Sequence, residues 1–207
     1  MIPGRRIGEG LEHFGVKGRT RIARRGWIEL ICGPMFSGKT ERLLERLAAA
    51  RAESIPVAVF KHSSDDRYDN HQLVTHSGLR TAACPVASAA KLLELAGEAR
   101  LVVIDEAQFF GIDLVSACQR LSEGGCIVVV AGLDRDSWGE PFGPVPYIEQ
   151  IADRVTRTTA KCAACGAVAD RTQRIAPIAG LCMIGGPEAY EPRCSKCFVA
   201  PPVELRR

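Results

Sequence analysis

The sequence lacks the features of membrane and secreted proteins. No apolar stretch approaches the roughly 20 residues that a helix needs to cross a bilayer, and the first 26 residues contain no apolar core of the kind that a signal peptide requires. The net charge is only +3, which is weak support for a polyanionic partner. A chain of 207 residues, 46% hydrophobic and 25% charged, fits one medium globular domain with or without a small appendage.

Residues 1–26 differ in composition from the rest of the chain. They carry seven Lys or Arg against two Glu and show neither a helical nor a strand period. We interpret them as a basic, disordered extension. A mitochondrial transit peptide is the alternative, because the segment is rich in arginine, but it lacks the serine that such peptides contain.

Apolar strands alternate with helices between residues 27 and 154. The patterns predict strands at 27–32, 57–61, 101–106 and 126–133, and helices at 40–51, from Ser88 onward, and at 112–123. Continuous apolar strands interleaved with helices imply a parallel sheet covered on both faces. Such a sheet binds ligands beyond the carboxyl ends of its strands. Cys, Gly and Pro become frequent after about residue 155, so we place a domain boundary near residue 154.

The first strand is followed by a phosphate-loop motif. The sequence GPMFSGKT matches G-x-x-x-x-G-K-[ST] and opens the first helix, which is the context that the motif requires. The backbone N–H groups of such a loop point at phosphate oxygens, the lysine adds a charge, and the final hydroxyl can ligate Mg²⁺. The predicted phosphate-binding residues are Gly33, Pro34, Met35, Phe36, Ser37, Gly38, Lys39 and Thr40.

Two adjacent carboxylates end the strand at 101–106. Asp105 fits the role of a carboxylate that holds the Mg²⁺ shell, and Glu106 would then face the attacking group. The alternative is that the pair only caps the strand or is solvated. Asp65, Asp66 and Arg67 lie in a polar loop at another strand end, where Arg67 is a candidate phosphate contact. The histidines match no ligand pattern and are predicted to be surface or loop residues: His13, His62, His71 and His76.

Nine cysteines without a secretory signal favour metal binding in a reducing compartment over a disulfide scaffold. Two C-x-x-C pairs supply four thiolates, the set that a structural tetrahedral Zn²⁺ prefers: Cys162, Cys165, Cys194 and Cys197. The 28 residues between the pairs exceed the usual spacing of a zinc ribbon, so we expect a long loop there. The alternative is four unrelated cysteines. The remaining five show no partner spacing and are expected to be buried small hydrophobes: Cys32, Cys84, Cys118, Cys126 and Cys182.

Further motifs complete a resemblance to a known family. The segments GPMFSGKT, DDRY, IDEAQFF, GLD…EPFG, TQR and IGGPEAYEPRCSKC occur in this order from about residue 27 to residue 197. With these motifs the chain resembles the thymidine kinases of the zinc-containing, type II class. The joint match covers most of the chain, and GPMFSGK with IDEAQFF alone separates this family from most other phosphate-loop proteins.

The resemblance implies an α/β fold with a parallel-sheet, P-loop NTPase-like (RecA-like) core and a small C-terminal zinc-binding lasso domain. The expected divisions are an extension at 1–26, an ATP-binding core at 27–154 and the lasso domain at 155–207. The implied reaction transfers the γ-phosphoryl group of ATP to the 5′-hydroxyl of thymidine, or of deoxyuridine, for DNA synthesis. Implied cofactors are ATP, Mg²⁺ and structural Zn²⁺. A cytoplasmic homotetramer inhibited by dTTP is expected, with no nucleic-acid or membrane partner.

The resemblance also assigns roles by position. Glu106 would accept the proton of the 5′-hydroxyl, and Gln108 would lie beside the phosphates with Asp65, Asp66 and Arg67. Residues 181–185 would drape over the base as a lasso that binds it through backbone groups. The implied substrate-binding residues are Met35, Phe109, Leu133, Ser137, Thr172, Leu181, Cys182, Met183, Ile184, Gly185 and Tyr190.

Two positions depart from the family pattern. Ser137, followed by Trp138, stands where the family usually has Phe, so either an aromatic contact with the base is lost or Trp138 replaces it. Ala107 stands where Gly is common, which is a mild change. The rival interpretation is a nucleic-acid-stimulated ATPase with a zinc ribbon, in which Glu106 would activate water. The low net charge and the apolar segment between the cysteine pairs count against it.

Overall fold

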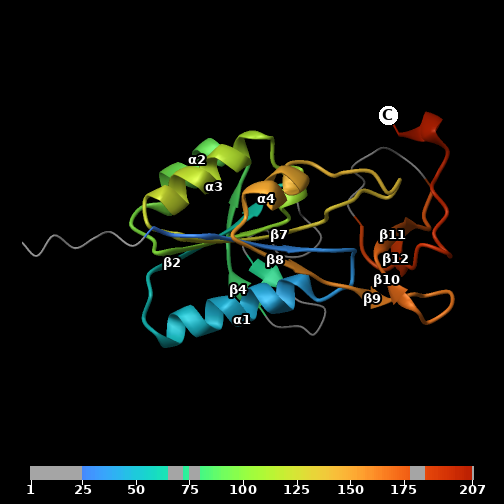
Figure 1. Cartoon of the computed structure of the whole chain (residues 1–207), viewed down its shortest axis with the longest axis horizontal. Helices are drawn as coiled ribbons and strands as arrows, with labels where there is room; N and C mark the ends of the chain where they lie inside the picture. The colour runs from blue at the N-terminus through green and yellow to red at the C-terminus, as the bar shows by residue number, and fades with distance from the viewer. Residues whose placement is uncertain (1–24, 65–71, 75–79, 178–184, 207) are drawn as a thin grey trace, which may run out of the picture.

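The computed structural model describes residues 25–64, 72–74, 80–177 and 185–206 (Figure 1). The predicted basic extension lies almost entirely outside these described residues. The central feature is a six-stranded sheet with the strand order β5-β2-β6-β7-β1-β8, in which every neighbouring pair is parallel. Its strands are β1 (Ile28–Cys32), β2 (Val57–His62), β5 (Cys84–Val86), β6 (Leu101–Asp105), β7 (Ile127–Gly132) and β8 (Arg154–Arg157). The predicted α/β fold with a parallel sheet is confirmed.

Helices cover both faces of the sheet. One face is covered by α1 (Lys39–Ala52), and the opposite face by α2 (Ala89–Ala96), α3 (Asp113–Glu123) and α4 (Val145–Ile151) (Figure 1). Strand residues alternate between two cores: Val128 and Val130 pack on the α2–α4 side, whereas Val129 and Ala131 pack on the α1 side. Because both faces are buried, the central strands β6 and β7 are continuous apolar runs, as the sequence pattern indicated, whereas the edge strand β8 is polar and mostly exposed.

Short strands make up the rest of the described chain. An antiparallel pair, β3 (Gln72–Val74) and β4 (Arg80–Ala82), lies between β2 and β5 in sequence. The C-terminal part contains two further antiparallel pairs, β9 (Ala160–Lys161) with β10 (Val168–Ala169), and β11 (Arg171–Arg174) with β12 (Tyr190–Arg193). Two 3₁₀ turns are η1 (Ala107–Phe109) and η2 (Val203–Leu205). The boundary placed near residue 154 falls within β8, which belongs to the central sheet.

Two expectations about single residues were wrong. His62 is buried at the end of β2, where its ring packs edge-on against Phe110 with the ring centroids 4.7 Å apart. A histidine can occupy such a strand position because its ring is largely apolar and one nitrogen accepts the backbone N–H of Ser64. Cys84 is exposed, because β5 is an edge strand, whereas Cys32, Cys118 and Cys126 are buried as expected.

A buried carboxylate joins the first helix to the sheet. Glu29, on β1, accepts two hydrogen bonds from Arg46 of α1, at 2.8 and 2.9 Å, and one from the indole of Trp27 at 2.7 Å. Arg154 of β8 lies 3.6 Å from the same carboxylate. Burial raises the pKa of Glu29, but the hydrogen bonds and charges of its partners outweigh it, so the pKa is lowered overall. This network therefore fixes the helix that starts at the phosphate loop.

Replacing Glu29 with Gln should lower the free energy of unfolding at pH 7 by about 1–3 kcal/mol, because three partly exposed donor groups lose a charged acceptor that is itself buried. Because the pKa of Glu29 is lower in the folded protein than in the unfolded chain, the ionised carboxylate stabilises the fold at pH values above the unfolded pKa of about 4.3. This stabilisation is lost as the pH falls through the lower pKa of the folded protein. Urea unfolding at neutral and acidic pH measures the difference. Glu45→Gln, at an exposed position of the same helix, is the control, and an equal effect of both changes would contradict the role of this network.

Candidate active site and metal centre

The predicted phosphate loop lies between β1 and α1 and turns sharply at its two glycines. Gly33 has φ 145° and Gly38 has φ 80°, a region in which glycine is favoured. A Cβ on Gly33 would lie 2.3 Å from the carbonyl oxygen of Thr158, so no larger residue fits there. Within the loop, the Lys39 ammonium donates to the Pro34 carbonyl at 2.6 Å. The strand–loop–helix context that the motif requires is therefore present.

The loop contacts the acidic end of β6. The Thr40 hydroxyl donates to the Asp105 carboxylate at 3.2 Å, although the two residues are 65 positions apart in sequence. A hydroxyl and a carboxylate oxygen are hard ligands of the kind that Mg²⁺ prefers. The pair thus fits the two protein ligands that phosphate-loop enzymes contribute to a magnesium ion. Lys61, a fully buried lysine, is the neighbour of Asp105 in the adjacent strand, and the motifs gave no indication of it.

Glu106 follows Asp105 in a left-handed conformation, with φ 54° and ψ 41°. Its backbone N–H donates to the Asp105 carboxylate at 2.9 Å, and its own carboxylate accepts a short hydrogen bond from the Gln108 amide. The oxygen of the same Gln108 side-chain amide, Oε1, accepts the backbone N–H of Leu133 at 3.0 Å, just after β7. A non-glycine residue in this region is strained, and such residues gather at functional sites. Gln108 therefore holds the Glu106 carboxylate against the end of the neighbouring strand.

A small hydrophobic cluster lies beside the phosphate loop and joins it to the C-terminal part. Its buried members are Met35, Ala189 and Tyr190, with Leu133 partly buried among them. Gly185 lies against Tyr190, because a Cβ on this glycine would be 3.4 Å from the tyrosine ring. The structure thus brings together Met35, Leu133, Gly185 and Tyr190, four residues expected to contact the substrate.

Other expected substrate contacts lie around this cluster. The Thr172 hydroxyl accepts the backbone N–H of Met35 at 3.0 Å, which ties β11 to the phosphate loop. Phe109 is partly buried and contacts Phe142 edge-on, with the ring centroids 6.0 Å apart. Ser137 is buried. The expected contacts Asp65, Asp66, Arg67, Leu181, Cys182, Met183 and Ile184 lie outside the described residues.

Trp138 faces the C-terminal segment. Its indole N–H donates to the Pro202 carbonyl at 3.1 Å, and the residue is 7% exposed. Asp136 organises the same turn by accepting the backbone N–H groups of Trp138 and Glu140 at 2.9 and 3.0 Å. Arg206 donates to the second oxygen of Asp136 at 2.9 Å. The polar edge of the indole is thus directed toward the end of the chain.

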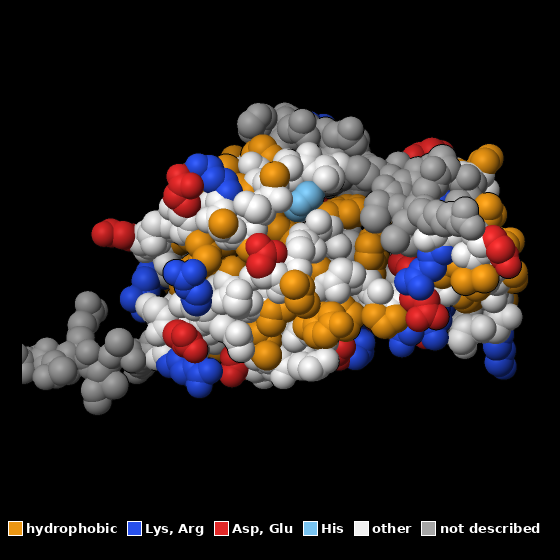
Figure 2. Space-filling model, turned by 90° about the horizontal axis from the view of Figure 1, so that it is seen from above, with side chains coloured by type: hydrophobic (Ala, Val, Ile, Leu, Met, Phe, Trp, Pro, Cys, Tyr) orange, Lys and Arg blue, Asp and Glu red, His pale blue; other side chains and the backbone are white. Residues whose placement is uncertain are grey.

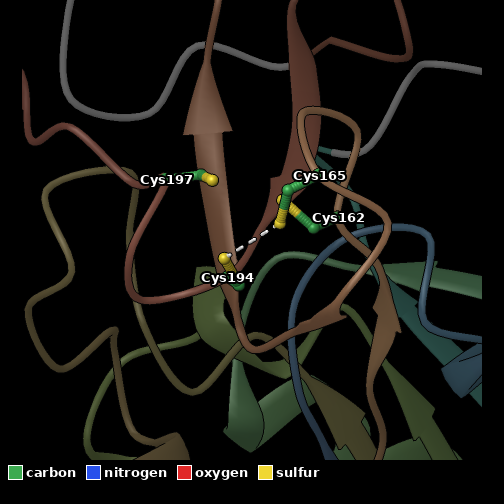
Figure 3. A group of neighbouring side chains, drawn as sticks. All are labelled: Cys162, Cys165, Cys194 and Cys197. Atoms are coloured by element: carbon green, nitrogen blue, oxygen red, sulfur yellow. Dashed lines mark hydrogen bonds between the residues drawn. The ribbon is translucent and has the colours of Figure 1, made fainter.

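The four paired cysteines form one cluster (Figure 3). The sulfur atoms of Cys162, Cys165, Cys194 and Cys197 all lie within 4.8 Å of one another, and those of Cys165 and Cys194 are 3.6 Å apart. One C-x-x-C pair lies on the β9–β10 hairpin and the other follows β12. Four convergent thiols are the donor set of a tetrahedral zinc site. The cysteines could therefore hold a zinc ion, although the pairs are far apart in sequence.

The electrostatics of the cluster favour a bound cation. Desolvation raises the pKa of Cys162, but backbone N–H groups at positions 194, 165 and 164 outweigh it and lower the pKa to about 6. Hydrogen bonds with Cys165 and Cys194 raise the pKa of Cys197 to about 12. Four thiolates this close repel one another, and a divalent metal removes that repulsion.

The sequence patterns missed Thr158, which supports the phosphate loop from outside. It lies directly after β8, is 5% exposed, and its hydroxyl is 2.6 Å from the Ser37 hydroxyl. No motif or period includes this residue, because the contact exists only once β8 has paired with β1.

Comparison with known proteins agrees with this geometry. The family model described as "Thymidine kinase" matches residues 26–198. A protein named thymidine kinase from Rhodothermus sp. (strain ITI 518) is 46% identical over 176 residues, which cover 85% of this chain and 83% of that relative. None of the described helices is long and apolar enough to span a bilayer. The family match, the identity and the arrangement of the phosphate loop beside an acidic strand end agree: the chain belongs to the thymidine kinase family.

Proposed function

We propose that the protein transfers the γ-phosphoryl group of ATP to the 5′-hydroxyl of thymidine, giving dTMP, and that it also accepts deoxyuridine. The observation that carries this proposal is the hydrogen bond between Thr40 and Asp105 at 3.2 Å. It joins the phosphate loop to the strand end whose next residue, Glu106, is the candidate base. Family membership supports thymidine as the acceptor.

On the donor side, residues 33–40 bind the ATP phosphates through backbone N–H groups and the Lys39 ammonium. Thr40 and Asp105 are the residues that would hold Mg²⁺, which neutralises charge on the phosphates when bound. Lys39, which contacts the Pro34 carbonyl in this structure, turns to the phosphate oxygens. Asp65, Asp66, Arg67 and Gln108 complete our proposed donor site.

On the acceptor side, Glu106 orients the 5′-hydroxyl and takes its proton as the phosphoryl group transfers. Its carboxylate is held by Gln108, which is itself anchored on the Leu133 backbone. Such anchoring keeps the carboxylate from rotating, and positioning is the main contribution of an enzyme to phosphoryl transfer. The strained backbone of Glu106 is consistent with a functional constraint.

We assign the base pocket to the cluster of Met35, Leu133 and Tyr190, together with Phe109 and Thr172. The remaining contacts are backbone groups of the lasso, residues 181–185. Backbone donors and acceptors read the edge of a pyrimidine, so a purine would leave buried polar groups unpaired. Ser137 lies nearby in our assignment but supplies no aromatic surface.

The lasso domain requires an anchor, and we propose that structural zinc at the four cysteines provides it. We also infer dTTP as a feedback inhibitor, since its triphosphate fits the phosphate loop and its base fits the acceptor pocket. Assembly as a homotetramer and a cytoplasmic location are part of the same proposal. On the face drawn in Figure 2, acidic and basic side chains of the described residues are interspersed.

The first test is Glu106→Gln, which keeps the size of the side chain and one oxygen able to accept the Gln108 amide N–H, but removes the base. We expect kcat for thymidine phosphorylation to fall about 10²- to 10⁴-fold with ATP and thymidine binding retained. Steady-state kinetics and calorimetric titration measure these quantities. Glu123→Gln, at an exposed position at the end of α3, is the matched control. A near-normal kcat for Glu106→Gln would remove Glu106 from the role of base.

The second test concerns the acceptor. We expect turnover with thymidine and deoxyuridine, which differ by one methyl group, and little with deoxyadenosine. ATP consumption is measured with each nucleoside and, separately, with single-stranded DNA. Stimulation by DNA without any nucleoside product would favour the ATPase alternative, and equal use of deoxyadenosine would contradict the pocket.

The third test is metal analysis. The purified protein should contain stoichiometric zinc, and Cys197→Ser should lose it, unfold at a lower temperature and bind thymidine less tightly, because the lasso loses its anchor. Cys84→Ser, at an exposed cysteine outside the cluster, should match the wild type in all three measurements. Full thymidine affinity in a zinc-free Cys197→Ser protein would show that the metal does not support the pocket.

A further inference from the structure

Thr158 is a buried residue of the C-terminal part that touches the phosphate loop. Its backbone N–H donates to the Cys32 carbonyl at 2.7 Å, and its hydroxyl lies 3.1 Å from the same oxygen. The hydroxyl is also 2.6 Å from the hydroxyl of Ser37, inside the loop. Thr158 therefore connects the residue that precedes the loop to a residue near its middle.

The protons available to this network restrict how it can be arranged. The two hydroxyls of Thr158 and Ser37 supply two protons to three contacts, namely Thr158 with Cys32, Thr158 with Ser37, and Ser37 with the Pro34 carbonyl at 2.7 Å. Two hydroxyl oxygens 2.6 Å apart need a proton between them. The donors therefore run in one direction, either from Ser37 through Thr158 to Cys32, or from Thr158 through Ser37 to Pro34.

Movement of Lys39 to a phosphate would favour one of these two directions. In this structure the Pro34 carbonyl accepts the Lys39 ammonium at 2.6 Å. When Lys39 turns to a phosphate, the Pro34 carbonyl loses this donor and keeps the Ser37 hydroxyl, 2.7 Å away, as its remaining side-chain donor. The Ser37 proton then points to Pro34, so the only proton for the contact between the two hydroxyls comes from Thr158. The Thr158 hydroxyl thus holds Ser37 in the orientation that donates to the Pro34 carbonyl.

The backbone around this contact has little freedom to move. A Cβ on Gly33 would lie 2.3 Å from the Thr158 carbonyl and 2.5 Å from its hydroxyl. Farther along the loop, the Met35 N–H donates to the buried Thr172 hydroxyl. Two buried threonines outside the motif therefore hold the loop, Thr158 near its first glycine and Thr172 near its centre.

We propose that Thr158 is a positioning residue for the phosphoryl donor, acting through Ser37 on the conformation of the loop that receives the ATP phosphates. The proposal rests on the proposed function of this loop as the ATP site. Thr158 does not touch the nucleotide; it stabilises the loop once Lys39 has moved to the phosphates. Its loss should therefore weaken ATP binding and leave thymidine binding unchanged.

The test compares Thr158→Val, which keeps the shape and removes the hydroxyl, with Thr158→Ser, which keeps the hydroxyl. Calorimetric titration with Mg·ATP should show a Kd increased about three- to tenfold for Thr158→Val, as expected for one hydrogen bond, and unchanged for Thr158→Ser. The KM for thymidine should stay constant in both. Thr159→Val, at the exposed neighbouring residue, should behave like the wild type.

The proposal would be overturned if Thr158→Val bound ATP as tightly as the wild type. It would also be overturned if Thr158→Ser lost as much ATP affinity as Thr158→Val. If Thr158→Val does not fold, Ser37→Ala cuts the same contact from the loop side and also removes the hydrogen bond to Pro34, so the Kd should rise at least as much. Unchanged ATP affinity in Ser37→Ala would overturn the proposal. If the wild-type protein failed to phosphorylate thymidine, the proposed function would be rejected. A difference in ATP affinity between Thr158→Val and Thr158→Ser would still support the role of the Thr158 hydroxyl in positioning the phosphate loop.

Discussion

The site depends on one constraint, which is that all strands of a parallel sheet end at the same edge. Each helix returns the chain to the start of the next strand, so the loops after β1, β6 and β7 collect at that edge. Thr40 lies in the loop and helix that follow β1, and Asp105 is the last residue of β6. Because only β7 lies between these two strands, the two side chains can meet. Gln108 then links Glu106 to Leu133 after β7. The candidate catalytic residues are thus brought together without any long-range motif in the sequence.

The C-terminal part completes the site. Thr172 and Tyr190 belong to the paired strands β11 and β12, and both reach the phosphate loop, one through the Met35 N–H and one through the hydrophobic cluster. Cys194 follows β12 directly. A metal held by the four cysteines would thus fix the ends of the strands that carry these contacts. Under the proposed function, zinc bound in this place would affect nucleotide and nucleoside binding through the position of the strands, without touching either ligand.

The sequence predicted the features that depend on local patterns. The phosphate loop has four constrained positions in eight residues, and the central strands are continuous apolar runs, so both could be located. The strands β9–β12 have two to four residues each, too few for a period to appear. Thr158 and Gln108 act through partners more than 20 positions away, at contacts that only the folded sheet creates. The burial of His62 was missed because residue type alone indicates a polar environment.

The left-handed backbone at Glu106 explains how two adjacent carboxylates can serve one cleft. In an extended strand, successive side chains point to opposite faces, so Asp105 and Glu106 would be separated by the sheet. The turn at φ 54° ends β6 at Asp105 and brings the Glu106 N–H back to the Asp105 carboxylate. A non-glycine residue in this conformation costs about 1–2 kcal/mol, and the hydrogen bond from Gln108 offsets part of it. The strained turn thus places the candidate base, Glu106, beside the candidate magnesium ligand, Asp105.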